Sequence, residues 1–129
     1  MSVVLVVDDN EDNLRVTEEI LKTHGFTVHT ARDGASALRS IEQSGPDVVL
    51  LDVMLPDMDG MEVLDRLRSN SAHAKLPVIL VTAKSQDEDV IAGYKIGADY
   101  YITKPCTAKQ LLYGIGLVLD RVEAAAVKE

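Results

Sequence analysis

One stretch near the middle of the chain, residues 48–56 (VVLLDVMLP), constrains the fold more than any other. Four aliphatic residues, Val48 to Leu51, lead directly into Asp52. An uninterrupted aliphatic run predicts a strand with neither face in water, as in the middle of a parallel sheet covered by helices. The carboxylate would then lie at the carboxyl end of that strand, where open α/β sheets hold their ligand sites.

The spacing of apolar residues along the rest of the chain predicts five strand–helix units. Strand-like runs begin near Val3, Thr27, Asp47, Pro77 and Tyr100. Strands that alternate with helices favour a parallel sheet with helices on both faces. The second run alternates polar and apolar residues, so we place it at the edge of the sheet. This pattern favours the flavodoxin-like (βα)5 fold, doubly wound, with strand order 2-1-3-4-5.

Sequence signals also mark where helices begin and end. Three segments fit the capping-box pattern, in which two side chains satisfy free N–H groups at a helix start: Asp59 to Glu62, Ser85 to Glu88, and Thr107 to Gln110. Left-handed ends of helices are predicted at Gly25, Gly45 and Gly97. The fourth helix, around residues 90–96, has weak amphipathic spacing, so we expect it to be the least firmly docked.

The composition argues against several classes of protein. Thirteen Lys and Arg against 21 Asp and Glu give a net charge of −8, which disfavours nonspecific binding to nucleic acid or anionic membranes. No apolar run approaches the ~20 residues that span a bilayer, and a strand expected at Val3 leaves no room for a signal peptide. The single cysteine, Cys106, excludes an internal disulfide and fits a reducing cytoplasm. We expect one domain over residues 1–122, followed by a helical tail or the start of a linker over residues 123–129.

Acidic residues follow two strands that this order makes neighbours. Asp8 and Asp9 follow the first strand and Asp52 follows the third, at the switch point of the sheet. Three converging carboxylates repel one another unless a cation neutralises them, and an all-oxygen site with retained water suits Mg²⁺. The alternative is that Asp8 and Asp9 merely begin a helix and that Asp52 begins a turn.

Two further strand ends would bring groups that bind an oxyanion to the same edge. The fourth strand leads to Thr82 and the fifth to Lys104. The ammonium, the hydroxyl and the backbone N–H of Ala83 suit phosphoryl oxygens. An aspartate beside such donors and a hard cation can be the nucleophile in phosphoryl transfer. Alternatively, Lys104 is a surface lysine and Thr82 a turn residue.

From Val3 to Val122 the sequence resembles a response-regulator receiver domain, the phospho-acceptor domain of two-component signalling. The resemblance rests on four segments in order: residues 6–10 (VVDDN), 50–60 (LLDVMLPDMDG), 81–83 (VTA) and 97–105 (GADYYITKP). It implies a phosphorylation-activated switch that catalyses only its own phosphorylation and dephosphorylation, and is not otherwise an enzyme.

The resemblance implies a metal-assisted role for the acidic residues. Asp52 would accept a phosphoryl group from the phosphohistidine of a sensor histidine kinase or phosphotransfer protein. Asp9, Asp52 and the backbone carbonyl of Met54 would ligate Mg²⁺ directly, and Asp8 would act through a metal-bound water. The hydrophobic side chain of Met54 would not orient an attacking water, so the phosphorylated form should lose its phosphoryl group slowly.

The resemblance also implies how the signal leaves the site. Thr82 and Lys104 would hold the phosphoryl oxygens, and the bond between Lys104 and Pro105 would be cis. Thr82 would move on phosphorylation and the ring of Tyr101 would fill the space it leaves; the alternative is a Tyr101 that does not switch. An output domain or effector protein would read the change on the fourth helix, fifth strand and fifth helix, in a monomer or a phosphorylation-dependent homodimer.

Other functions fit parts of the pattern. A pseudo-receiver, a protein-interaction module that works without phosphorylation, generally lacks one of the acids, the threonine or the lysine, and all are present here. A hydrolase of the haloacid-dehalogenase kind carries Asp-x-Asp after its first strand, whereas Asp8 and Asp9 are adjacent. Neither glycine-rich nucleotide motif, GxGxxG or GxxxxGKS/T, occurs. A nucleophilic Cys106 lacks an identified partner, so a structural cysteine is favoured.

Overall fold

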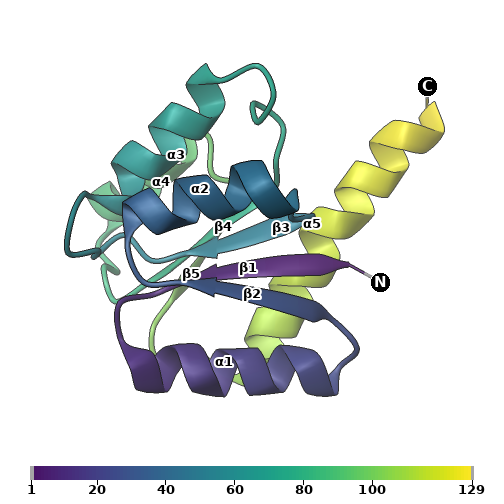
Figure 1. Cartoon of the computed structure of the whole chain (residues 1–129). Coiled ribbons are helices and arrows are strands. Elements are labelled where there is room, and N and C mark those ends of the chain that lie inside the picture. The colour runs from purple at the N-terminus through teal and green to yellow at the C-terminus, as the bar shows by residue number, and fades with distance from the viewer. Residues whose placement is uncertain (1, 129) are drawn as a thin grey trace.

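The computed structural model describes the backbone of residues 2–128 and the side chains of residues 2–121. Within these residues five strands and five helices alternate (Figure 1). The strands are β1 (Val3–Val7), β2 (Thr27–Ala31), β3 (Val48–Leu51), β4 (Val78–Thr82) and β5 (Tyr100–Thr103). The helices are α1 (Glu11–Thr23), α2 (Gly34–Ser44), α3 (Gly60–Ser69), α4 (Asp87–Ile96) and α5 (Ala108–Lys128).

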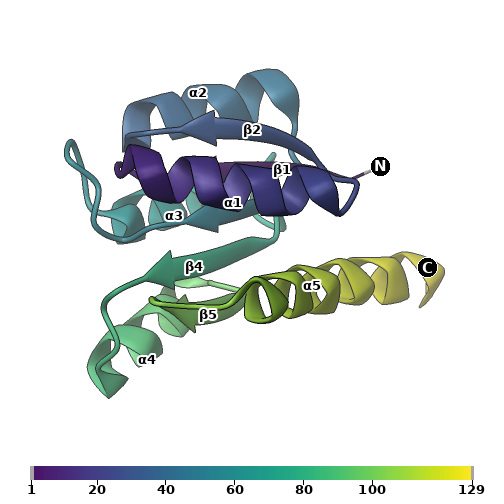
Figure 2. The same cartoon turned by 90° about the horizontal axis from the view of Figure 1, so that it is seen from below.

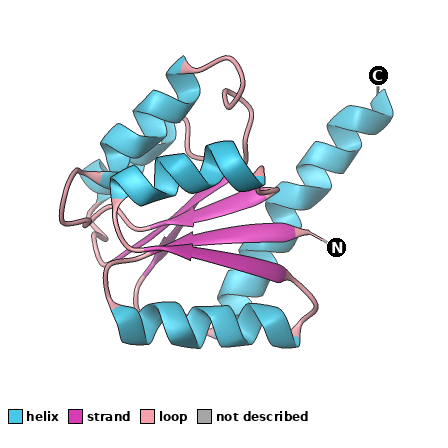
Figure 3. Ribbon diagram, viewed as in Figure 1, coloured by secondary structure: helices cyan, strands magenta, loops and turns pink. Residues whose placement is uncertain are grey.

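All strand pairs are parallel and the sheet has the order β2-β1-β3-β4-β5, which confirms the predicted topology (Figure 3). The aliphatic run Val48–Leu51 is buried at all four positions, in the central strand. β2 lies at the edge and exposes three of its five residues. Continuous aliphatic runs therefore mark the strands covered on both faces, and alternation marks an edge strand.

Helices cover both faces of the sheet (Figures 1 and 2), and an apolar layer lies between the helices and each face. On one face the sheet packs against α1 and α5, through side chains that include Leu14, Leu21 and Ile115. On the other face it packs against α2, α3 and the α4–β5 connection, with Ile41 and Leu64 near the centre. Each fully buried aliphatic side chain contributes about 1.5–3 kcal/mol to folding. Both layers hold the carboxyl ends of the strands in fixed register.

The predicted capping residues begin α3 and α5 but not α4. At α3 the side chain of Asp59 accepts the N–H of Met61 at 2.8 Å, and Glu62 bonds instead to Arg66. Thr107 and Gln110 cap α5 reciprocally, with N···O distances of 2.9 and 3.1 Å. The prediction that Ser85 caps α4 was wrong: the helix begins at Asp87, and Gln86 occupies the capping position in an extended conformation with no side-chain bond. Ser85 is thus one residue too early to reach the free N–H groups. Three acidic residues in the first turn complement the helix dipole instead.

Helix α4 buries fewer of its residues than α2 and α3 do, which agrees with its weak amphipathic spacing. Gly93 is its one fully buried residue, and a side chain there would press on Leu80 and Tyr101. The helix ends at Gly97, whose φ of 124° is a conformation that side-chain-bearing residues rarely adopt. Over the described part of the chain, no helix is both long and apolar enough to cross a lipid bilayer.

Candidate functional site

Three carboxylates meet at the carboxyl ends of β1 and β3. The register pairs Val7 with Leu51, so the acids that follow these two residues lie side by side. The backbone N–H of Asp52 continues this pairing by donating to the carbonyl of Val7 at 3.0 Å. One carboxylate oxygen from each of Asp8, Asp9 and Asp52 lies within 4.8 Å of the others. The strand order thus brings together residues that are more than forty positions apart in the chain.

The two buried acids of this cluster are held by backbone and lysine donors. Asp8 and Asp52 are each 6% exposed, whereas Asp9 is exposed to solvent. Asp52 accepts the N–H of Met54 at 3.0 Å on Oδ1, and Asp8 accepts the N–H of Asn10 at 2.9 Å on its own Oδ1. Their Oδ2 atoms both face Lys104. Each carboxylate is therefore fixed at both oxygens.

Lys104 links the two buried acids. Its Nζ donates to Oδ2 of Asp8 at 2.6 Å and to Oδ2 of Asp52 at 2.7 Å. The residue follows β5 and precedes Pro105 through a cis peptide bond, as expected. Burial works against its charged form, but the hydrogen bonds and charges of Asp52 and Asp8 outweigh burial and raise its pKa above the usual 10.5. Lys104 is consequently an ammonium at neutral pH.

The donor set fits a hard divalent cation. Three carboxylates and one ammonium leave two negative charges uncompensated. Carboxylate oxygens are the ligands that Mg²⁺ prefers, and one exposed member of the cluster leaves room for retained waters. The cluster opens into a shallow cleft of about 470 Å³, whose lining includes Asp9, Met54 and Lys84. The side chain of Met54 is 55% exposed in this cleft.

Thr82 is the last residue of β4, the strand next to β3, and Ala83 follows it. Thr82 is fully buried, and its Oγ1 accepts a long bond of 3.4 Å from the N–H of Lys84. Ala83 is exposed at the head of the loop that leads to α4. The structure thus places a hydroxyl and a backbone N–H one strand away from Asp52, at the same edge of the sheet.

Tyr101 lies in β5 and is hydrogen-bonded to the loop that follows Thr82. Its hydroxyl donates to the carbonyl of Lys84 at 2.7 Å, and its ring packs against Gly93 of α4. Burial raises the pKa of the phenol, and the charges of Asp89 and Asp52 raise it further. The ring therefore contacts the loop that carries Ala83 and Lys84, and also the helix beyond that loop.

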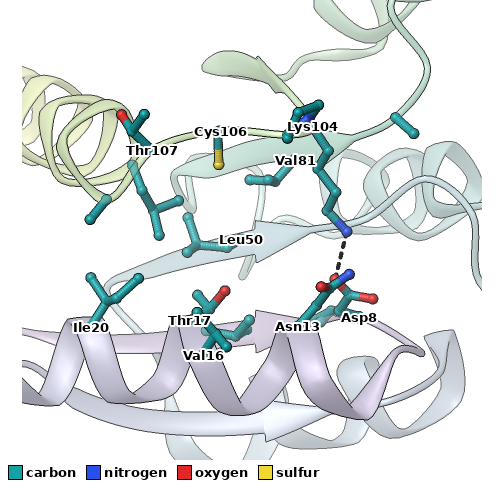
Figure 4. Close-up of a pocket in the computed structure, with 16 residues that line it drawn as sticks. Asp8, Asn13, Val16, Thr17, Ile20, Leu50, Val81, Lys104, Cys106 and Thr107 are labelled. Atoms are coloured by element: carbon teal, nitrogen blue, oxygen red, sulfur yellow. Dashed lines mark hydrogen bonds and ion pairs between the residues drawn. The ribbon is translucent and has the colours of Figure 1, made fainter.

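A groove of about 490 Å³ lies beside the cluster, between α1 and the start of α5 (Figure 4). Val16, Ile20 and Leu50 form much of its apolar lining, and Lys104 reaches across one end toward Asp8. Cys106 projects into this groove. Burial raises the pKa of its thiol, and the nearby Lys104 only partly opposes this effect. A raised thiol pKa disfavours the thiolate, which agrees with a structural cysteine.

Asp57 is a charged residue near the site that the sequence patterns missed. Its carboxylate accepts the backbone N–H groups of Gly34 at 2.8 Å and Ala35 at 3.0 Å. These bonds hold the pKa of Asp57 below the usual 3.8. Its partners precede it by more than twenty residues, so no local capping signal could have revealed the contact.

The sheet is doubly wound and carries an acid cluster at its switch point. A lysine lies between two of the acids, and a buried threonine lies on the next strand. This combination defines the receiver class of signalling domain. Residues 4–115 match the model of the response regulator receiver domain family. The chain belongs to this family and is a receiver domain of two-component signalling.

Individual relatives agree with this assignment. The sensory transduction protein RegX3 of Mycolicibacterium smegmatis is 43% identical over 121 residues, which cover 94% of this chain and 52% of the relative. The chain therefore spans about half the length of the curated relatives that it matches.

Solved structures of receiver proteins match over most of the chain. A CheY-like response regulator receiver domain protein from Methanospirillum hungatei superposes with a TM-score of 0.90 at 32% identity, covering 97% of this chain and 98% of that one. The Mn²⁺-bound form of response regulator Rcp1 superposes with a TM-score of 0.76 at 33% identity, covering 86% of each chain.

Proposed function

We propose that Asp52 accepts a phosphoryl group, in a reaction that requires Mg²⁺, and that the resulting acyl phosphate switches the domain between two signalling states. The observation that carries the proposal is the position of Asp52, which is buried, bonded to Lys104 and within 4.8 Å of two further carboxylates. A carboxylate held only for stability would not need a second and a third acid beside it, because like charges at this distance are unfavourable.

The reaction forms one bond and breaks one. An oxygen of Asp52 attacks the phosphorus of a phosphohistidine, the P–N bond breaks, and its electron pair returns to the imidazole of the donor. Lys104 is close enough to exchange its bond to Asp52 for a bond to a phosphoryl oxygen, since its Nζ already lies 2.7 Å from Oδ2. The hydroxyl of Thr82 and the N–H of Ala83 would bind the remaining oxygens.

Asp8, Asp9, Asp52 and the carbonyl of Met54 would hold the cation. Bound there, Mg²⁺ would neutralise charge on the phosphoryl oxygens. The Mn²⁺-bound form of Rcp1, a relative with the same fold, supports a divalent ion in such a domain. The absence of a hydrogen-bonding group on the exposed Met54 side chain supports slow hydrolysis of the acyl phosphate.

We further propose that α4, β5 and α5 carry the change to a partner. A bond from Thr82 to a phosphoryl oxygen would draw the loop after β4 toward Asp52, and this loop is bonded to the hydroxyl of Tyr101 through Lys84. The uncapped start of α4 supports its displacement. Among the side chains of α4 and α5 up to residue 121, three large apolar ones stay exposed: Ile91, Tyr94 and Tyr113. They suit an output domain, an effector protein or a second copy of the chain.

The test is phosphorylation by a small-molecule acyl phosphate, which needs no knowledge of the cognate kinase. Intact-mass spectrometry should show one added phosphoryl group on the wild type with Mg²⁺, and none with EDTA or on Asp52→Asn. The alternative, a pseudo-receiver that works without phosphorylation, predicts no added mass under any of these conditions. Equal labelling of Asp52→Asn would also contradict the proposal.

A further inference from the structure

The loop between β3 and α3, residues 52–59, is attached to the first turn of α2 by a side chain. It passes the start of α2 on its way to α3 (Figure 1). The two oxygens of Asp57 accept the N–H groups of Gly34 and Ala35, the first two residues of that helix. The next N–H, that of Ser36, is taken by Asp33 at 2.7 Å. Asp57 therefore supplies acceptors for two N–H groups at the start of α2 that have no partner within the helix itself.

Apolar packing reinforces the same attachment. Met58 and Leu55 pack against the buried layer that contains α2 and α3. Met58 lies directly over Gly34, where a Cβ would approach its Sδ to 2.7 Å. The loop is thus held at the helix start by two hydrogen bonds to the Asp57 carboxylate and by the apolar contact of Met58 with Gly34.

Met54 lies in the short segment between Asp52 and this attachment. The carbonyl of Val53 accepts two N–H groups, from Leu55 at 3.2 Å and from Gly60 at 2.8 Å. Met54 also pairs with Asp59 in an isolated antiparallel bridge. These bonds are all internal to the loop and its junction with α3. Asp52, at the start of the loop, bonds to Val7 and to Lys104. Beyond Asp52, Asp57 provides the hydrogen bonds that fix the loop to another element of the fold, α2.

We infer that Asp57 is a positioning residue for the cation site: by attaching the loop to α2, it holds the backbone carbonyl of Met54 where that carbonyl can ligate a divalent cation. The inference rests on the proposed function, because it takes Met54 as a ligand. Asp57 itself would contact neither the cation nor the phosphoryl group, since its two oxygens face α2. Its charged form is favoured at neutral pH by the same two N–H bonds.

The experiment measures Mg²⁺ binding directly, by isothermal titration calorimetry on the unphosphorylated full chain. Asp57→Ala removes both bonds to α2 and should weaken Mg²⁺ binding about 10-fold, the usual effect of losing a group that orients a ligand. Asp59→Asn is the matched control. It removes the same charge from the same loop, and asparagine can still cap α3 in place of the acid that accepts the N–H of Met61.

Two readouts separate positioning from a general loss of structure. In ¹⁵N spectra, the amides of Gly34 and Ala35 should exchange faster with solvent in Asp57→Ala, while those of the central strands keep their protection. In phosphorylation by a small donor, the Mg²⁺ concentration for half-maximal rate should rise about 10-fold, while the rate at saturating Mg²⁺ stays near that of the wild type.

The outcomes are distinguishable. Equal Mg²⁺ affinity of the wild type and Asp57→Ala would overturn the inference and leave the proposed function standing. Equal weakening in Asp57→Ala and Asp59→Asn would also overturn it, because charge alone would then explain the effect. A wild type that binds no Mg²⁺ would refute the proposed function and the inference together.

Discussion

Replacing Lys104 by methionine tests the electrostatics of the site. Methionine keeps much of the unbranched apolar side chain but removes the ammonium that donates to Asp8 at 2.6 Å and to Asp52 at 2.7 Å. The two carboxylates, each only 6% exposed, would then face each other and Asp9 with no positive charge between them. We therefore expect Lys104→Met to destabilise the cation-free protein.

The size of the expected loss in unfolding free energy follows from how deeply Lys104 and its two acidic partners are buried. Unit charges at about 2.7 Å attract by about 6 kcal/mol at an effective dielectric constant near 20, before desolvation is subtracted. Removing one partner of a buried pair costs about 3–5 kcal/mol in measured cases. The side chain of Lys104 is 22% exposed and its two partners are 8% and 9% exposed. Since the lysine reaches some solvent, we expect about 3 kcal/mol, at the lower end of that range.

The assay is urea unfolding at neutral pH, with EDTA or with Mg²⁺. The loss of stability should be smaller in Mg²⁺, because the dication supplies the positive charge that the lysine no longer provides. The raised pKa of Lys104 sets the pH dependence: its contribution is complete below the unfolded value near 10.5 and is lost as the pH rises through the higher folded value. Lys75→Met, at an exposed position before β4, is the control. Unchanged stability of Lys104→Met in EDTA would contradict this expectation. An equal gain in stability from Mg²⁺ in the wild type and in Lys104→Met would contradict it as well.

Two further substitutions test the packing of the fold, one at the amino-terminal edge of the sheet and one beside the site. Arg68→Ala should lower the free energy of unfolding in urea by about 2–3 kcal/mol. The guanidinium of Arg68 is mostly buried and donates to the carbonyl of Gly97 at 2.9 Å and to Asp99 at 3.0 Å. A loss of stability no larger than that caused by replacing an exposed arginine would contradict this. Gly60→Ala should destabilise the protein by about 1–3 kcal/mol and slow its phosphorylation, since a Cβ would collide with the backbone carbonyl of Asp52. A variant with the stability and labelling rate of the wild type would show that the loop can accommodate the added methyl group.

The sequence was sufficient for the arrangement of the strands. The aliphatic residues of β3 and the alternation in β2 report burial on two faces and on one, and that difference sets which strand is central and which is at the edge. The convergence of Asp8, Asp9 and Asp52 then follows from the strand order, because neighbouring parallel strands end at the same edge. The reciprocal cap at Thr107 was also readable, since its partner is three residues away.

Contacts between side chains that are far apart along the chain could not be predicted from the sequence. No spacing rule states that Lys104 would bond to both Asp8 and Asp52, or that Asp57 would cap a helix that begins 23 residues earlier. These contacts depend on how the loops pack once the sheet has formed. The start of α4 was mispredicted for a related reason: Ser85 fits the capping pattern, but the backbone at Gln86 stays extended. A local motif permits a cap and does not enforce one.

The position of the acyl phosphate identifies the nucleophile, which we propose to be Asp52. After phosphorylation with Mg²⁺, borohydride reduction converts an aspartyl phosphate to homoserine, and peptide mass spectrometry identifies the altered position. Homoserine should form at position 52 alone, and none should form when Mg²⁺ is replaced by EDTA. Homoserine at Asp8 or Asp9, or stable phosphorylation that yields no homoserine, would contradict this proposal.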